Sequence, residues 1–271
     1  MPTSPSQARP DWPKRLNRAA ELADRNPWAR EVLAFYSRIL QFQSDLYQGS
    51  RAMLGPPGTH QDGLRGSLNL DEAIRFFPDL VVVVRETGPQ KLAEEAGRLQ
   101  GSSVTQIRGM LQRWLSATEA QDDGSAFFAR VMLQPQAEKL ARAGGFTHEQ
   151  VVGNKCPYCQ SDPQLAVIRP EGDGGKRLLL CSFCQSDWEF RRILCPACGE
   201  EHHEKLPRYS ADGISAVRVE ACEVCKSYLK SVDMTVDGLA VPVVDEVATA
   251  PLDLWAAEQG YHKIHLNLMG F

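Results

Sequence analysis

The stretch that decides the fold of this 271-residue chain runs from residue 156 to residue 225 and holds all eight of its cysteines. It reads CPYCQSDP at 156–163, RLLLCSFCQSDWEFRRILCPACGEE at 177–201 and EACEVCKSYLK at 220–230. Four CxxC pairs follow one another, and the last two repeat the first two at offsets of 39 and 41 residues. Such self-similarity indicates two tandem copies of one small module.

The spacing of the pairs predicts which cysteines share a site. A CxxC knuckle points both sulfurs to one centre, and two knuckles complete a tetrahedral sulfur site. Gaps of 21 and 23 residues leave room for a hairpin within each module, whereas the 10 residues between the second and third pairs fit a linker. We therefore predict two metal sites with these ligands: Cys156, Cys159, Cys181 and Cys184 in the first, and Cys195, Cys198, Cys222 and Cys225 in the second. Four thiolates suit zinc or a single iron, and the sequence does not choose between them.

Two other uses of the cysteines compete with metal binding: a disulfide framework and a redox relay. A disulfide framework is usual in chains under about 100 residues that lack a core, but this chain is 43% apolar. A redox relay through CxxC disulfides would use a single motif at a strand-to-helix turn, not four in tandem. His202 and His203 follow the third pair, and we expect an exposed hairpin tip there, although a contribution to a site stays open. The remaining histidines weighed are expected on the surface: His60, His148, His262 and His265.

Residues 1–150 hold no cysteine, and their apolar residues recur at helical spacing. A long helix is predicted from Asn26-Pro27, because a cap followed by proline opens helices, and a Gly/Pro-rich loop is expected over 49–66. Further helices are predicted at 71–77, 80–86, 89–99, 104–117 and 125–143, the last kinked or split at Pro135 and ended by Gly144.

The predicted fold class is α+β, with a helical bundle of five or six helices followed by two rubredoxin-like or zinc-ribbon modules. The expected domains are 1–150 for the helical part, 151–192 for the first module, and 193–271 for the second module with a C-terminal helix and strand. In that helix, at 251–260, Leu252, Leu254 and Trp255 are expected in the core, with a partner surface as the alternative.

Charge and hydropathy limit the possible partners. The longest apolar run ends at Arg85 and falls far short of the roughly 20 residues of a membrane helix, and residues 1–15 lack the layout of a secretory signal. We expect a cytoplasmic protein. Residues 151–271 carry 12 Lys and Arg against 17 Asp and Glu, and each thiolate site around a divalent ion adds about −2. Such a surface repels phosphates, so a protein partner is favoured over nucleic acid, with a local basic face of Arg177, Arg191 and Arg192 left open. No catalytic motif is present, and no enzyme is predicted.

Together with the tail LDLWAAEQGYHKIHLNLMGF at 252–271, the cysteine motifs resemble the FdhE-type formate dehydrogenase accessory proteins of bacteria. The resemblance covers roughly residues 150–271. It implies a cytoplasmic, chaperone-like maturation factor that binds the catalytic subunit of respiratory formate dehydrogenase and is needed for formation of the active enzyme. It also implies iron at the eight cysteines, and it says nothing of oligomeric state. Further residues on motif positions, without individual roles, are Trp188, Arg192, Tyr228, Lys230, Asp253 and Tyr261.

One departure from the family pattern concerns Gln160, which follows the first knuckle where glycine is often found. Glycine suits the positive φ that such turns need, so a more strained first site is predicted. The alternative function from the residues alone is a zinc-ribbon protein that binds nucleic acid or acts in transcription. A component of an electron-transfer enzyme is the third.

Overall fold

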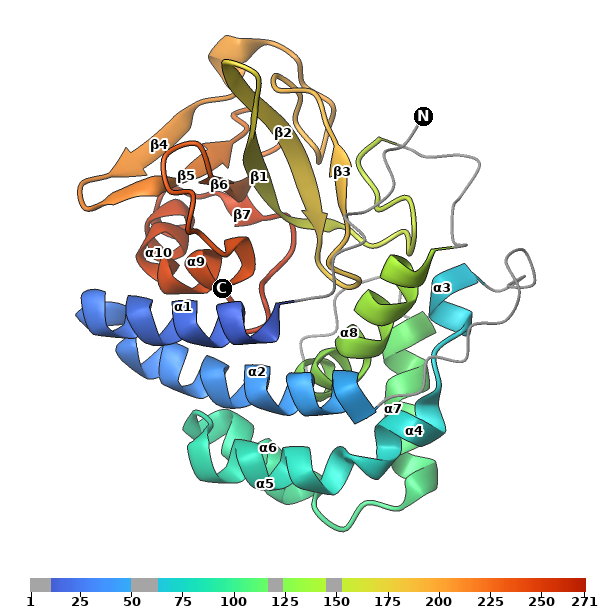
Figure 1. The fold of residues 1–271 in the computed structure, drawn as a ribbon. Coiled ribbons are helices and arrows are strands. Elements are labelled where there is room, and N and C mark those ends of the chain that lie inside the picture. Colours follow the sequence, from blue (N-terminus) through green and yellow to red (C-terminus); the bar gives the residue numbers. More distant parts are fainter. Residues whose placement is uncertain (1–10, 50–62, 117–123, 145–152) are drawn as a thin grey trace.

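The computed structural model describes residues 11–49, 63–116, 124–144 and 153–271. Its fold class is α+β, as predicted, with a helical N-terminal part and a C-terminal sheet that carries the cysteines (Figure 1). The helical elements are α1 (Trp12–Arg25), the short 3-10 helix η1 (Pro27–Ala29), α2 (Arg30–Gly49), α3 (Gly63–Gly66), α4 (Leu70–Arg75), α5 (Phe77–Thr87), α6 (Gln90–Leu99), α7 (Val104–Ser116) and α8 (Ser125–Ala143).

Helix α1 was not predicted from the sequence. Asp11 caps it by accepting a hydrogen bond from the Lys14 amide at 2.9 Å, and Pro13 lies in its first turn. Its buried residues include Trp12 and Leu22, spaced for one helical face. Helix α3 likewise lies inside the predicted loop 49–66, most of which falls outside the described residues.

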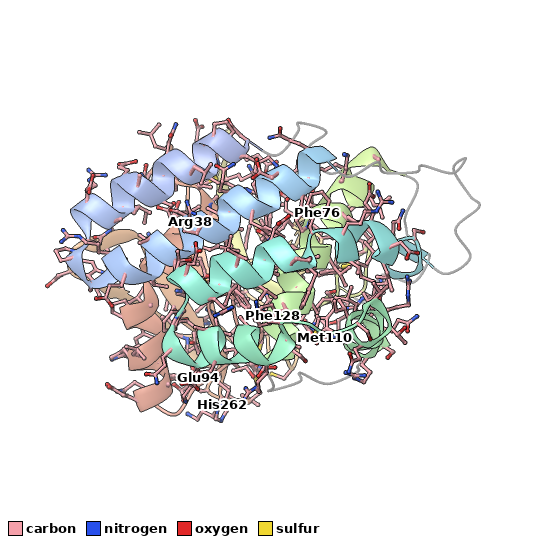
Figure 2. All side chains as sticks on the ribbon, turned by 90° about the horizontal axis from the view of Figure 1, so that it is seen from below. Arg38, Phe76, Glu94, Met110, Phe128 and His262 are labelled. Atoms are coloured by element: carbon pink, nitrogen blue, oxygen red, sulfur yellow. The ribbon has the colours of Figure 1, made fainter. Side chains whose placement is uncertain are left out.

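Pro135 was predicted to kink or split the helix at 125–143; α8 runs through it as one helix, so the split is excluded. Proline has no amide hydrogen and leaves the carbonyl four residues earlier, that of Val131, without its helical donor. Gln43 of α2 donates to this carbonyl from Nε2 at 3.3 Å, which replaces the missing bond. The helix ends at Gly144 with a φ of 84°, as expected. Phe128 of α8, labelled in Figure 2, is fully buried in the helical core, with its ring 6.1 Å from that of Phe77 in α5.

The sheet contains both predicted modules. Its strands are β1 (Pro163–Glu171), β2 (Gly174–Cys181), β3 (Asp187–Glu189), β4 (Arg208–Ala211), β5 (Ile214–Ala221), β6 (Ser227–Asp233) and β7 (His262–Lys263). The order is β3-β2-β1-β6-β5-β4, so each module is an antiparallel meander of three strands. Strands β1 and β6 pair in parallel, with Leu165 opposite Lys230, and join the two modules. The domain limits at 150 and 192 stay predictions, and the first lies outside the described residues.

Two helices link the sheet to the N-terminal part. Helix α9 (Pro242–Ala248), which was not predicted, contacts α1, α2 and β6, and α10 (Ala250–Glu258) contacts β5 and β7. Figure 1 shows both between the sheet and α1. In α10, Leu252 is buried, Leu254 is exposed and Trp255 is half-buried. None of the helices in the described part of the chain has the length and apolar character to cross a membrane.

Candidate metal centres

The four CxxC turns share one backbone geometry. In each, the amide of the first cysteine donates to the carbonyl five residues later at 2.9 Å, and the acceptors are Ser161, Ser186, Glu200 and Ser227. The residue after the second cysteine closes the turn with a positive φ, which is 61° at Gln160, 57° at Gln185, 80° at Gly199 and 56° at Lys226. This conformation is unfavourable for any residue with a Cβ. The positive φ at Gln160 is therefore confirmed, and two further turns share its strain, at Gln185 and Lys226.

Two of these turns carry a compensating side-chain bond. The Nε2 of Gln160 donates to the carbonyl of Cys156 at 3.0 Å, and that of Gln185 donates to the carbonyl of Cys181 at 3.2 Å. Both turns belong to the first centre. Each bond ties the strained residue back to the start of its own turn.

The first centre gathers Cys156, Cys159, Cys181 and Cys184, all of them buried. The Sγ atoms of Cys156 and Cys184 lie 3.5 Å apart, and those of Cys159 and Cys181 lie 3.3 Å apart. The amides of Phe183 and Cys184 donate to the sulfur of Cys181 at 3.3 and 3.4 Å. Amide donors of this kind stabilise a thiolate.

The second centre gathers Cys195, Cys198, Cys222 and Cys225. Its sulfurs lie 3.7 Å apart both between Cys195 and Cys225 and between Cys198 and Cys222. Unlike the first centre it is open, because Cys198 is exposed and Cys225 is half-buried. Beside it is an open hollow of about 540 Å³, lined by Cys198, Gly199, Glu200, Glu201, His202, Lys205 and Val224.

Both groups fit a single ion held by four thiolates. Metal–sulfur bonds of about 2.3 Å in a tetrahedron place the sulfurs about 3.8 Å apart, close to the 3.3 to 3.7 Å found here. A disulfide would need about 2.05 Å, and all eight cysteines are free thiols. The two clusters can hold metal ions, while the role of each cysteine as a ligand stays a prediction and iron and zinc fit equally well.

The thiols of the two centres ionise unequally. Burial raises the pKa of Cys181 and Cys184 well above the usual value. Burial also opposes ionisation of Cys159, but hydrogen bonds from Cys156 and Cys181 outweigh it and hold the pKa of Cys159 well below that value. At Cys225, hydrogen bonds from Ser227 outweigh burial and lower the pKa to about 7. Because a metal binds thiolates, loading either centre releases protons.

The histidines lie apart from the sulfur clusters. His202 and His203 are exposed, and neither belongs to a group of metal-ligating atoms in the described residues. His262 is exposed as expected, but His265 is half-buried, so its placement on the surface was wrong. Burial lowers the pKa of His265 to about 4. The expectations for the histidines at positions 60 and 148 lie outside the described residues.

The three arginines considered as a basic face are engaged within the protein. Arg177 is buried, pairs with Glu220 at 2.7 Å and lies over the ring of Phe190. Arg191 pairs with Glu201 at 2.6 Å, and Arg192 donates to the carbonyl of Gly175. Arg177 is therefore buried away from any phosphate and Arg191 is paired with a carboxylate, while Arg192 is exposed.

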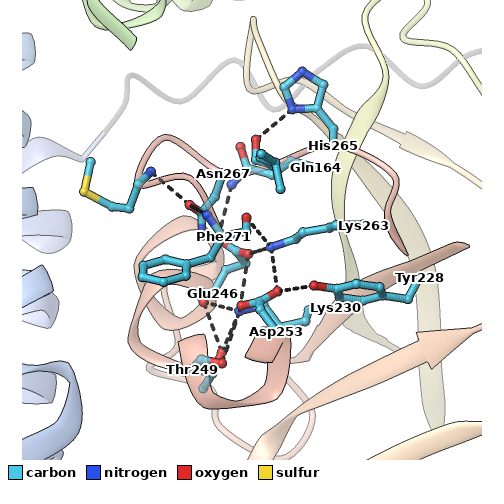
Figure 3. Close-up of polar contacts among 12 residues, drawn as sticks. Gln164, Tyr228, Lys230, Glu246, Thr249, Asp253, Lys263, His265, Asn267 and Phe271 are labelled. Atoms are coloured by element: carbon cyan, nitrogen blue, oxygen red, sulfur yellow. Dashed lines mark hydrogen bonds and ion pairs between the residues drawn. The ribbon is translucent and has the colours of Figure 1, made fainter. Parts of the chain in front are cut away.

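A buried charge network joins β6 to helices α9 and α10 (Figure 3). The spacing of the cysteines did not predict it. Lys230 of β6 is fully buried and lies 2.5 Å from a carboxylate oxygen of Asp253 and 3.3 Å from one of Glu246. Lys263 contacts both carboxylates, at 2.9 Å from Asp253, and the Tyr228 hydroxyl donates to Asp253 at 3.0 Å. Two cations and two anions thus balance each other in the interior. Motif positions 228, 230 and 253 from the family resemblance fall in this network.

Comparisons with known proteins agree with this arrangement. Family models described as the FdhE central domain and the FdhE C-terminal domain match residues 155–192 and 179–269. The protein FdhE homolog of Aquifex aeolicus strain VF5 is 30% identical over 267 residues, which cover 94% of each chain. The homolog of Haemophilus influenzae strain PittGG is 34% identical over 269 residues, covering 94% of this chain and 86% of the relative.

A solved structure shows the same fold. The crystal structure of the FdhE protein from Pseudomonas aeruginosa aligns with a TM-score of 0.71 at 23% identity, covering 99% of this chain and 97% of that one. Its helical and sheet parts are therefore both represented here. With matched domain models, full-length relatives and a shared fold, the chain belongs to the FdhE family.

Proposed function

We propose that this chain is a chaperone-like accessory factor that binds the catalytic subunit of respiratory formate dehydrogenase and is needed for formation of the active enzyme. The observation that carries the proposal is the pair of four-thiol centres inside the matched FdhE domains. We place this activity in the cytoplasm, before the enzyme is exported.

The chemistry of the centres supports an accessory role without catalysis. Four protein thiolates around one ion leave no open coordination position for a substrate, which is typical of structural sites. Zinc would then serve only structure, whereas iron could exchange one electron. We propose iron at both centres, as the family resemblance implies, with zinc as the alternative.

Metal analysis of protein purified without oxygen tests the centres directly. We expect about two ions per chain, and absorption in the visible range if the ion is iron. Chains that carry no ion and whose cysteines are joined as disulfides would overturn the assignment of metal centres.

Binding and enzyme formation test the function. We expect the purified chain to bind the purified catalytic subunit, and its gene to be required for formate dehydrogenase activity in cells grown by formate respiration. Cys181→Ser should not restore activity to a deletion strain, whereas Val82→Ala, at an exposed position on α5, should. Full enzyme activity in the deletion strain would refute the proposed function.

A further inference from the structure

The internal repeat pairs each residue around the first centre with one around the second. In the first module, the inner residues of the second knuckle, Ser182 and Phe183, are each only 2% exposed because helices cover them. The ring of Trp114 in α7 meets Phe183 edge to face at 5.0 Å, and the guanidinium of Arg65 in α3 lies 5.4 Å from its centre. The helical part thus presents an aromatic ring and a cation to this face.

The same arginine reaches the first knuckle. Arg65 donates to the hydroxyl of Ser161 at 2.9 Å and to the carbonyl of Leu115 at 3.0 Å. On the other side of the face, Gln134 of α8 donates to the carbonyl of Ser182 at 3.1 Å. The face of the first centre is therefore a docking surface, occupied by the chain's own helices.

The corresponding face of the second centre is open. Val224 stands where the first module has Phe183 and is 53% exposed. Ala197 and Glu223, which correspond to the buried Tyr158 and Ser182, are also exposed. In the described part of the chain these residues and Cys198 are all exposed, whereas α3 and α7 cover the first face.

The charge of the open face differs from that of the covered one. Glu200 is the counterpart of Ser161, the residue that Arg65 contacts in the first module. Glu201 lies beside Glu200 in the wall of the hollow. Lys205 also lines the hollow, with Nζ 3.9 Å from Glu200. A loaded centre adds about −2 to this balance. Glu201 pairs with Arg191 at 2.6 Å and Glu223 pairs with Lys226, so the net negative charge of the face comes from the thiolates of a loaded centre. This charge beside the apolar Val224 complements a cationic partner.

We propose that this face, formed by Ala197, Cys198, Glu200, Glu223 and Val224, is where the client docks. The occupant is a segment of the formate dehydrogenase catalytic subunit that presents an arginine or lysine beside an aromatic or aliphatic side chain. It covers the second centre as Arg65 and Trp114 cover the first. This inference rests on the proposed function and assigns it a surface.

The test compares two substitutions at equally exposed valines. Val224→Arg places a cation in the apolar part of the face, and Val82→Arg does so on α5, where the exposure is 50% against 53% at Val224. With purified full-length protein and purified catalytic subunit, calorimetry should show binding weakened at least tenfold by Val224→Arg and unchanged by Val82→Arg. Metal content is measured for each variant to show that both centres remain loaded. Wild-type binding should also weaken as salt rises, because the contact is partly ionic.

The outcomes separate the inference from the function on which it rests. If wild type and Val224→Arg bind equally well, the surface is wrong while the proposed function stands. If wild type does not bind the subunit, both fail. If sedimentation shows a wild-type dimer that Val224→Arg dissociates, the occupant is a second copy of the chain and the client proposal is overturned. Hydrogen exchange should slow on client binding at residues 196–201 and 222–226, and unchanged exchange there would also overturn it.

Discussion

Replacing Lys230 with methionine tests the buried charge network most directly. The ammonium of Lys230 is fully buried, and it donates to Asp253 and to the hydroxyl of Thr249 at 3.2 Å. Methionine keeps most of the volume and removes the charge. Glu246 and Asp253 then share a single buried cation, Lys263, so that one anion is left without compensation.

The size of the effect follows from this imbalance. Removing one partner of a buried ion pair lowers stability by about 3–5 kcal/mol, because the remaining charge stays in a medium that solvates it poorly. For a chain of this length each kcal/mol lowers Tm by about 2–4 °C, which predicts a fall of about 6–20 °C. The double variant Lys230→Met, Asp253→Asn has no excess charge. It should recover at least half of the lost stability, since only Glu246 and Lys263 remain to pair.

Unfolding in urea, followed by circular dichroism, measures these differences. The control is Lys205→Met, where the side chain is 54% exposed and the expected change is within about 0.5 kcal/mol. Metal content is determined for every variant, so that loss of an ion is not mistaken for loss of the network. A Lys230→Met variant within about 1 kcal/mol of wild type would refute the reasoning that the network is balanced charge by charge.

Three further predictions concern single positions. Phe183→Ala should lower the free energy of unfolding in urea by about 3–5 kcal/mol, because it removes a ring that is 2% exposed, and a loss below about 1 kcal/mol would contradict that packing. Gly199→Ala should destabilise the protein by about 1–2 kcal/mol in thermal unfolding, because alanine is strained at the φ of 80° found there. Gly238→Ala is the control: at both sites the new methyl group meets no atom within 4 Å, but Gly238 does not have a positive φ, so no loss is expected. Burial opposes ionisation of Glu246, but Lys230 and Lys263 outweigh it and lower the pKa of Glu246 to about 2 from 4.5. Its contribution of about 3 kcal/mol is thus complete above pH 4.5 and lost as the pH falls toward 2, a slope that unfolding of Glu246→Gln should lack.

Features set by local sequence were predictable. The helical segment that begins at Pro27, first as η1 and from Arg30 as α2, followed from a proline and apolar residues at a 3.6-residue period, which act within a few turns. The predicted cap is wrong, because the side chain of Asn26 makes no capping hydrogen bond. The sharing of four thiols between two CxxC turns followed from ligand number and loop length alone. Helix α1 was not predicted because it begins within the proline-rich stretch 1–15, which masks the helical pattern. Trp12 and Leu22 nevertheless lie on one face of it.

Features set by distant contacts were not predictable. The parallel pairing of β1 with β6 joins residues 165 and 230, and neither strand signals its partner. The lysine at 230 lies in a strand whose neighbours do not reveal its partners, because the carboxylates that balance it come from α9 and α10. The unbroken course of α8 depends on Gln43, which lies 88 residues from the carbonyl it bonds. Each case depends on tertiary context, which overrides the local rule.

The two copies of the module differ in their surroundings more than in their own geometry. The turns have the same amide bonds and positive φ values, and the sulfurs are spaced alike. What differs is the residue at the tip of the last knuckle, Phe183 in one copy and Val224 in the other. In the described part of the chain, Phe183 is covered by α3 and α7, whereas Val224 is exposed. The cysteines of the first centre are therefore shielded from solvent, whereas Cys198 of the second centre is exposed. One copy of the module thus packs against the chain's own helices, and the equivalent face of the other copy is the one that we propose for the client.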